Sequence, residues 1–110
     1  MSSVPDRLTL RILLIKEGSQ WVAQCLEHDL AAQGPEIDDA IDAFVSILAA
    51  TIVTDAEAGR QPLSRCRPAP AEYFDLVRRA KHLDRTPPRR LPDEVPPPWM
   101  RVLDPEVYVV

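Results

Sequence analysis

One histidine of the sequence lies between two carboxylates, in the tripeptide Glu27-His28-Asp29. An imidazole beside carboxylates supplies the groups used in general acid–base catalysis and in metal binding. Consecutive residues of an extended chain, however, point to opposite sides and converge poorly on one substrate or ion. We therefore expect the tripeptide to be a solvated connection between strands, with the role of His28 left open.

Carboxylates are missing from the two stretches with the clearest strand pattern, Leu8 to Ile15 and Trp21 to Leu26. Nuclease chemistry on a sheet would require several carboxylates gathered around metal ions. Their absence favours a protein without enzymatic activity, so we expect no catalytic residue, no cofactor and no metal ion.

The two cysteines, Cys25 and Cys66, form neither a CxxC motif nor a paired His/Cys zinc motif. This usage does not indicate a secreted disulfide framework and fits a reducing cytoplasm. Cys25, in a strand-like stretch, is best interpreted as a small buried hydrophobe. Arg65 and Arg67 favour a lowered thiol pKa for Cys66, but no base accompanies it, so we assign it no catalysis.

Four acidic residues gather where a helix is expected to begin, namely Glu36, Asp38, Asp39 and Asp42. Acidic side chains are favourable at this end of a helix because of its dipole. An acidic surface is also a dock for a basic partner, since complementary charge speeds association and suppresses wrong partners. We expect both roles together.

Basic residues gather further along the chain, at Arg78, Arg79, Lys81, Arg85, Arg89 and Arg90. They could contact phosphates or the acidic surface of a neighbouring subunit. No stacking aromatic residue is interleaved among them, which favours helix charge balance and a soluble linker instead. Whether Arg78 to Arg90 contacts nucleic acid stays open.

Period-two alternation predicts a strand over Leu8 to Ile15, followed by a polar turn in which Gly18 permits positive φ. A second strand over Trp21 to Leu26 completes a hairpin. A third short strand, Leu30 to Gln33, is expected to end at Gly34.

A long helix is predicted from Glu36 to Ala58, with Pro35 at its first position and Gly59 as the residue that ends it. Apolar residues recur along it at three-and-four spacing, so one side should cover the sheet. The expected core residues are Trp21, Ile37, Ile41, Phe44 and Leu48.

The second half of the sequence holds ten of the twelve prolines, from Pro62 onward. A short amphipathic helix is predicted over 71–83, followed by an extended Pro-rich connector over 86–98. Short strands are expected over 101–103 and 107–110, interrupted by Asp104-Pro105. Trp99 and Tyr108 are anchors of the core or of an interface.

With 110 residues, the chain is expected to build one core, organised as a β-β-β-α domain over 1–62 and an extension over 63–110. The extension should pack on the same domain or on a second subunit. The net charge of −4 argues against generic nucleic-acid binding, and no signal or membrane-spanning segment is apparent.

The run WVAQCLEHDLAAQGPEIDDAIDAFVSIL, from Trp21 to Leu48, resembles the N-terminal domain of HicB-type antitoxins. With the preceding strand, the resemblance covers about residues 8–58. It implies a β-β-β-α-β arrangement, a partial ribonuclease-H-like fold, and a role in binding and silencing a small HicA-type ribonuclease toxin, usually as an oligomer. Many members add a ribbon-helix-helix or helix-turn-helix segment that binds DNA. Neither is recognisable here, which puts DNA binding in doubt.

The sequence therefore predicts an α+β fold, in which a three-stranded antiparallel sheet, with a possible fourth strand from the C-terminal segment, packs against one long helix. A short second helix and the Pro-rich extension complete it. The expected function is that of a cytoplasmic HicB-like antitoxin whose partner is a small basic protein. The alternative is a stand-alone oligomeric scaffold of the same type, without a toxin partner.

Overall fold

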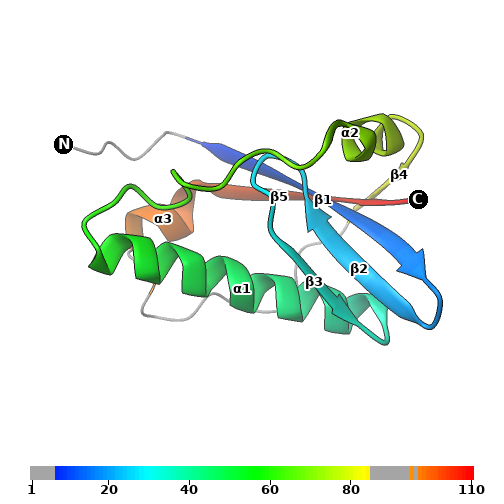
Figure 1. The fold of residues 1–110 in the computed structure, drawn as a ribbon, viewed down its shortest axis with the longest axis horizontal. Coiled ribbons are helices and arrows are strands. Elements are labelled where there is room, and N and C mark those ends of the chain that lie inside the picture. Colours follow the sequence, from blue (N-terminus) through cyan, green and yellow to red (C-terminus); the bar gives the residue numbers. More distant parts are fainter. Residues whose placement is uncertain (1–6, 85–94, 96) are drawn as a thin grey trace.

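A five-stranded mixed sheet lies at the centre of the protein (Figure 1). The computed structural model describes residues 7–84, 95 and 97–110. The strands are β1 (Leu8–Glu17), β2 (Gln20–Cys25), β3 (Ala31–Gly34), β4 (Lys81–Leu83) and β5 (Leu103–Val109); the helices are α1 (Ile37–Glu57), α2 (Ala71–Val77) and α3 (Pro97–Val102). The strand order is β3-β2-β1-β5-β4. The predicted α+β class is confirmed.

The first three strands form an antiparallel meander, close to the predicted positions. In the β1–β2 hairpin Glu17 lies opposite Gln20, which leaves Gly18 and Ser19 as a two-residue turn. Gly18 has φ +60°, as expected at the tip of a tight hairpin.

The sheet has more strands than predicted, and it is mixed rather than purely antiparallel. β5 runs parallel to β1 along its length, from Leu8 opposite Leu103 to Leu14 opposite Val109, and β4 pairs antiparallel with the end of β5. The short strand predicted over 101–103 and the interruption at Asp104-Pro105 were therefore wrong, whereas the strand predicted over 107–110 is the second half of β5. Residues 97–102 are helical, and one continuous strand follows.

Pro105 lies inside β5 without interrupting it, because its nitrogen is not needed for pairing with β1. The N–H of Val110 donates to the carbonyl of Leu14 in β1, and successive N–H groups alternate sides along a strand. The nitrogen of Pro105 therefore faces away from β1. On that side the register with β4 ends where Leu83 meets Val107. Proline is tolerated where a strand is unpaired.

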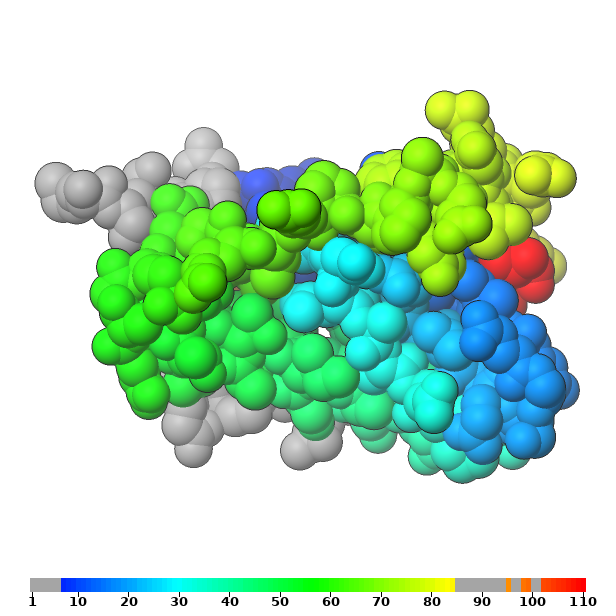
Figure 2. Space-filling model, in the orientation of Figure 1, coloured from blue at the N-terminus to red at the C-terminus, as the bar shows by residue number. Residues whose placement is uncertain are grey.

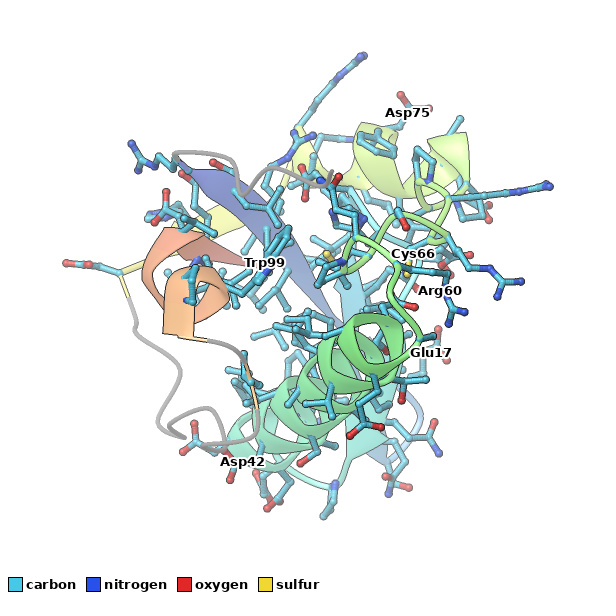
Figure 3. All side chains as sticks on the ribbon, turned by 90° about the vertical axis from the view of Figure 1, so that its left-hand side faces the viewer. Glu17, Asp42, Arg60, Cys66, Asp75 and Trp99 are labelled. Atoms are coloured by element: carbon cyan, nitrogen blue, oxygen red, sulfur yellow. The ribbon has the colours of Figure 1, made fainter. Side chains whose placement is uncertain are left out.

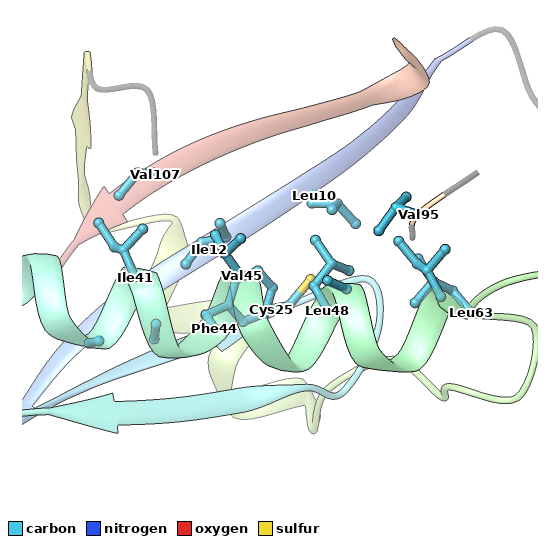
Figure 4. Packing of buried hydrophobic residues seen from close by; sticks show 14 of the residues in the cluster. Leu10, Ile12, Cys25, Ile41, Phe44, Val45, Leu48, Leu63, Val95 and Val107 are labelled. Atoms are coloured by element: carbon cyan, nitrogen blue, oxygen red, sulfur yellow. The ribbon is translucent and has the colours of Figure 1, made fainter. Parts of the chain in front are cut away.

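α1 covers one face of the sheet and supplies the largest part of the core (Figures 1 and 4). Ile41, Phe44 and Leu48 are buried against alternate residues of β1. Burying a side chain of this size contributes about 1.5–3 kcal/mol. Trp21 and Ile37 pack against this core but stay partly exposed.

Both ends of α1 lie within a residue of their predicted positions. Glu36 is the N-cap with extended φ of −124°, so Pro35 precedes the cap and is not the first helical residue. At the other end Gly59 has φ +73°. Its N–H donates to the backbone carbonyl of Ala56, and the N–H of Arg60 donates to the backbone carbonyl of Asp55. These two bonds make a Schellman motif, which requires a left-handed residue where Gly59 stands.

The second half of the chain packs on the same core as the first. Leu63, Val95, Trp99 and Val107 are all buried in the cluster that surrounds Phe44. Trp99 is thus a core residue, with 6% of its surface exposed. In Figure 2, the segment between α1 and α2 runs across the view above α1. One core therefore unites the regions 1–62 and 63–110.

The predicted second helix over 71–83 is half as long as expected. α2 ends at Val77, and Lys81–Leu83 form β4 instead, paired with β5. Helical spacing of apolar residues continued to Leu83 in the sequence, but a strand edge was available for these last residues. Pairing with a distant strand therefore decided their conformation. The expected connector over 86–98 falls mostly outside the described residues.

Candidate functional site

The structure places the four acidic residues predicted to bind a partner at the beginning of α1. Glu36, Asp38 and Asp39 are exposed, whereas Asp42 is half-buried. We call these four residues the acidic start of α1. In Figure 3, which looks along α1 from the end of the helix, Asp42 lies at the bottom of the view. The first three carboxylates are accessible to a partner, and Asp42 is less so.

Two of these carboxylates also cap the helix in a capping box: the Glu36 side chain accepts from the backbone N–H of Asp39, and the Asp39 side chain accepts from that of Glu36. Oδ2 of Asp39 accepts a hydrogen bond from the backbone N–H of Glu36 at 3.1 Å. The positive end of the helix dipole lies here and stabilises negative charge. Asp42 differs, since its Oδ1 is buried and has no hydrogen-bond partner in the described structure.

Gly34 fixes the acidic start of α1 against the sheet. It is buried at the end of β3, and a Cβ placed on it would lie 2.6 Å from Cβ of Asp39 and 2.8 Å from the nitrogen of Ala40. Any side chain would therefore separate β3 from the helix. The carboxylates stand on a helix end whose position relative to the sheet is set by close packing.

The tripeptide Glu27-His28-Asp29 directs its three side chains to different places. The carboxylate of Glu27 accepts from the backbone N–H of Arg11 at 2.7 Å and from its Nε at 2.5 Å. Asp29 accepts from Nε2 of Gln24 at 2.8 Å. The groups do not converge, and in the described part of the chain no three His, Cys, Asp or Glu residues gather around a possible metal position.

His28 is not the solvated residue that the sequence suggested. It is half-buried, and its Nδ1 is buried without a hydrogen-bond partner in the described structure. Burial lowers the pKa of His28, and the nearby Glu27 carboxylate and the backbone of Leu63 oppose this only in part. The side chain is thus a neutral packing residue between two loops.

The pKa values of both thiols are raised, which favours the protonated, less nucleophilic form. Cys25 is fully buried, and burial raises its pKa to about 11. Burial also raises the pKa of Cys66, helped by the negative charges of Asp55 and Asp29. The lowered thiol pKa considered for Cys66 because of Arg65 and Arg67 is not found, since burial and the carboxylates of Asp55 and Asp29 raise it.

Asp55 is a buried carboxylate that sequence analysis did not single out. It lies in the last turn of α1, where the helix dipole opposes negative charge. Its Oδ1 accepts from Nη2 of Arg60 at 3.0 Å, and its Oδ2 accepts from the N–H of Leu63 at 2.9 Å. Leu63 is buried with a left-handed φ of +68°. Asp55 therefore holds the loop that follows the helix.

A second group that the sequence did not reveal lies on β4 and β5. The hydroxyl of Tyr108 donates to Glu106 at 3.1 Å, and the ring of His82 meets that of Tyr108 edge-on, with centroids 5.1 Å apart. Burial and the Glu106 carboxylate raise the pKa of Tyr108. Only the pairing of β4 with β5 brings these residues together, and β4 was not predicted.

Of the basic group predicted over Arg78 to Arg90, the members that the structure describes follow α2 or lie in β4. Arg78 pairs with Asp75 at 3.6 Å, and both side chains are largely exposed. Arg79 and Lys81 are also exposed. Arg85, Arg89 and Arg90 lie outside the described residues.

Comparison with known proteins gives no relative. No protein-family model, no curated protein and no solved structure matches this chain. Among the described residues, no helix combines the length and the apolar character needed to cross a membrane. A functional assignment therefore depends on the chain's own geometry.

Proposed function

We propose that this protein is a HicB-like, antitoxin-type protein that binds and neutralises a small basic ribonuclease and has no enzymatic activity of its own. The observation that carries the proposal is the exposure of the Glu36, Asp38 and Asp39 carboxylates on a helix end fixed against the sheet. A ribonuclease carries positive charge to hold RNA. A rigid acidic surface matches that charge and favours fast, selective association.

The order of elements supports the proposal. β1, β2, β3 and α1 follow each other along the chain, and a later strand, β5, returns to lie beside β1. Apart from α2, β4 and α3, which lie between α1 and β5, this is the β-β-β-α-β order that the resemblance to HicB-type antitoxins implies. The described structure holds both cysteines as free thiols, which is compatible with the cytoplasmic setting that we propose.

The test uses charge reversal at the acidic start of α1. The partner for the test is sought as the product of a short basic reading frame beside the gene, and the assay is inhibition of its RNA cleavage by the purified protein. We expect the wild-type protein to inhibit cleavage and E36K/D38K to bind at least about tenfold more weakly, which corresponds to about 1.4 kcal/mol. Failure of the wild-type protein to bind or inhibit would contradict the proposal.

The matched control is E57K/E72K, which changes the net charge equally but at exposed residues near the end of α1 and in α2. It should inhibit as well as wild type, and circular dichroism should show that both variants are folded. Equal loss in both variants would mean that net charge, not this surface, governs binding. Recovery of the protein only with copies of itself would favour the stand-alone oligomeric scaffold.

A further inference from the structure

The two edges of the sheet differ in how they are protected. β4 forms one edge; it has three residues and exposes Lys81 and His82. An exposed lysine is typical of an edge that resists pairing with other chains. β3 forms the other edge, and its sequence Ala-Ala-Gln-Gly carries no charge. The structure thus has one guarded edge and one unguarded edge.

The unguarded edge offers specific backbone groups. The N–H of Cys25 donates to the carbonyl of Leu30 at 2.9 Å, so Leu30 faces β2. Backbone groups alternate sides along a strand, and those of Ala31 and Gln33 therefore face away from β2. Both residues are exposed, and in the described part of the chain no strand pairs with this side of β3.

Acidic side chains stand at both ends of this edge. Asp29 is exposed before β3 begins, and its Oδ1 accepts from Gln24 of β2. At the other end, Gly34 brings the strand within close packing distance of α1, and the exposed carboxylates of Glu36 and Asp38 follow. A strand that added to β3 would therefore lie between two negatively charged positions.

We propose that the free edge of β3 binds an extended, basic segment of a partner protein, which adds to the sheet as a further strand. Its backbone pairs with Ala31 and Gln33, and its lysine or arginine side chains lie near Asp29, Glu36 and Asp38. Strand addition of this kind takes affinity from main-chain hydrogen bonds and specificity from side chains. The inference rests on the proposed function, for which it names the mode of binding.

The charges argue against a second copy of this chain as the occupant. Two copies of β3 paired antiparallel about a twofold axis would bring Asp29 of each copy close to Glu36 of the other. Like charges facing each other across paired strands are destabilising. A basic segment meets the same positions with opposite charge.

The experiment uses the full chain and a short capped peptide of alternating lysine and valine as the probe. Hydrogen exchange followed by NMR should show slower exchange of the Ala31 and Gln33 amides when the peptide is present. The Q33P variant removes one outward-facing N–H without adding charge, and it should bind the peptide at least about tenfold more weakly. Q33A keeps that N–H and should bind as the wild-type protein does.

A second arm leaves the protein unchanged, so that misfolding of a variant cannot imitate the result. A lysine–valine peptide with alternate backbone nitrogens methylated keeps its charge but cannot pair on one side; it should bind at least about tenfold more weakly than the unmodified peptide. A glutamate–valine peptide should not bind. Equal binding of the methylated peptide, or slower exchange in β4 instead of β3, would overturn the proposal, as would a wild-type dimer that Q33P dissociates.

The two proposals can fail separately. If the basic ribonuclease binds wild type and Q33P equally, strand addition is wrong and the proposed function stands. If the lysine–valine peptide protects Ala31 and Gln33 but the ribonuclease does not bind, the edge site stands and the proposed function is wrong.

Discussion

At the beginning of α1 the carboxylates of Glu36, Asp38 and Asp39 are exposed, whereas near its end the carboxylate of Asp55 is buried. The first group lies where the helix dipole favours negative charge, and the second lies where the dipole opposes it. Asp55 is kept there by hydrogen bonds from Arg60 and from the backbone of Leu63.

The difference separates two uses of the same functional group. A carboxylate that has its hydrogen bonds satisfied inside the protein is structural, and its removal should be measured in stability. A carboxylate that is exposed at the beginning of the helix contributes less to folding, about the worth of a helix cap in the case of Asp39, and is accessible to a partner. Four predictions test this division and the packing around the two ends of α1, beginning with the largest expected effect.

The Asp55→Ala substitution should lower the free energy of unfolding by about 2–4 kcal/mol. It leaves the buried N–H of Leu63 without its acceptor and removes the partner of Arg60. Urea denaturation measures the loss. Asp38→Ala is the comparison at the other end, and we expect a change within about 0.5 kcal/mol. Equal losses at both positions would remove the distinction between the ends.

Replacing the glycines before and after α1 by alanine should also lower the stability by different amounts. Gly34→Ala forces a Cβ into the backbone of α1 and should cost about 2 kcal/mol through overpacking. Gly59→Ala meets no atom within 4 Å but must keep a left-handed φ, which costs about 1 kcal/mol. Thermal unfolding of both variants checks the order. A tolerated Gly34→Ala would show that β3 and α1 are not held as closely as described.

Asp39→Ala should cost about 1 kcal/mol, because it removes the acceptor of the Glu36 N–H and a charge favoured by the helix dipole. Glu57→Ala, at the opposite end of the helix, removes a charge that the dipole disfavours and should be neutral or slightly stabilising. Chemical denaturation at low ionic strength gives the comparison. The same cost for both would contradict the dipole argument.

The smallest effect concerns His28, which packs beside the loop that follows α1. Its pKa in the folded protein is lowered, so the unfolded chain takes up the proton first as the pH falls. Stability from the neutral side chain is therefore present above about pH 6.5 and is lost as the pH falls through the folded-state pKa. His28→Gln should flatten this part of the stability profile, whereas Asp38→Asn should leave it unchanged.

The sequence was sufficient to predict the strands and the helix whose positions depend on a local pattern of apolar residues. Period-two alternation located β1 and β2, and the spacing of Ile41, Phe44 and Leu48 located α1 and its buried side. β5 was predicted only in its second half, over 107–110, because Pro105 looked like a break, and its pairing with β1 was not foreseen because β1 is distant in the chain. A three-residue strand such as β4 carries too little pattern to compete with an apparent helix.

The candidate site was predictable in part for the same reason. Acidic residues before an apolar helical pattern are visible in the sequence, so the acidic start of α1 was found. Asp55 was missed, since its partners Arg60 and Leu63 approach it only through the loop after the helix. The exposed backbone of β3 was also invisible to sequence reasoning, because which strand forms an edge depends on the position of β5.

The place of β5 has a consequence for how the chain folds. Leu8 is paired with Leu103, so closing the sheet joins residues from opposite ends of the described chain. The β1–β2 hairpin can form from residues close in the chain. Until β5 pairs with β1, however, the other side of β1 stays unpaired and β4 has no strand to pair with. Such non-local closure slows folding. We expect residues 7–62 alone to be unable to hold the native sheet, and the whole chain to fold in one cooperative step whose speed is set by the arrival of β5.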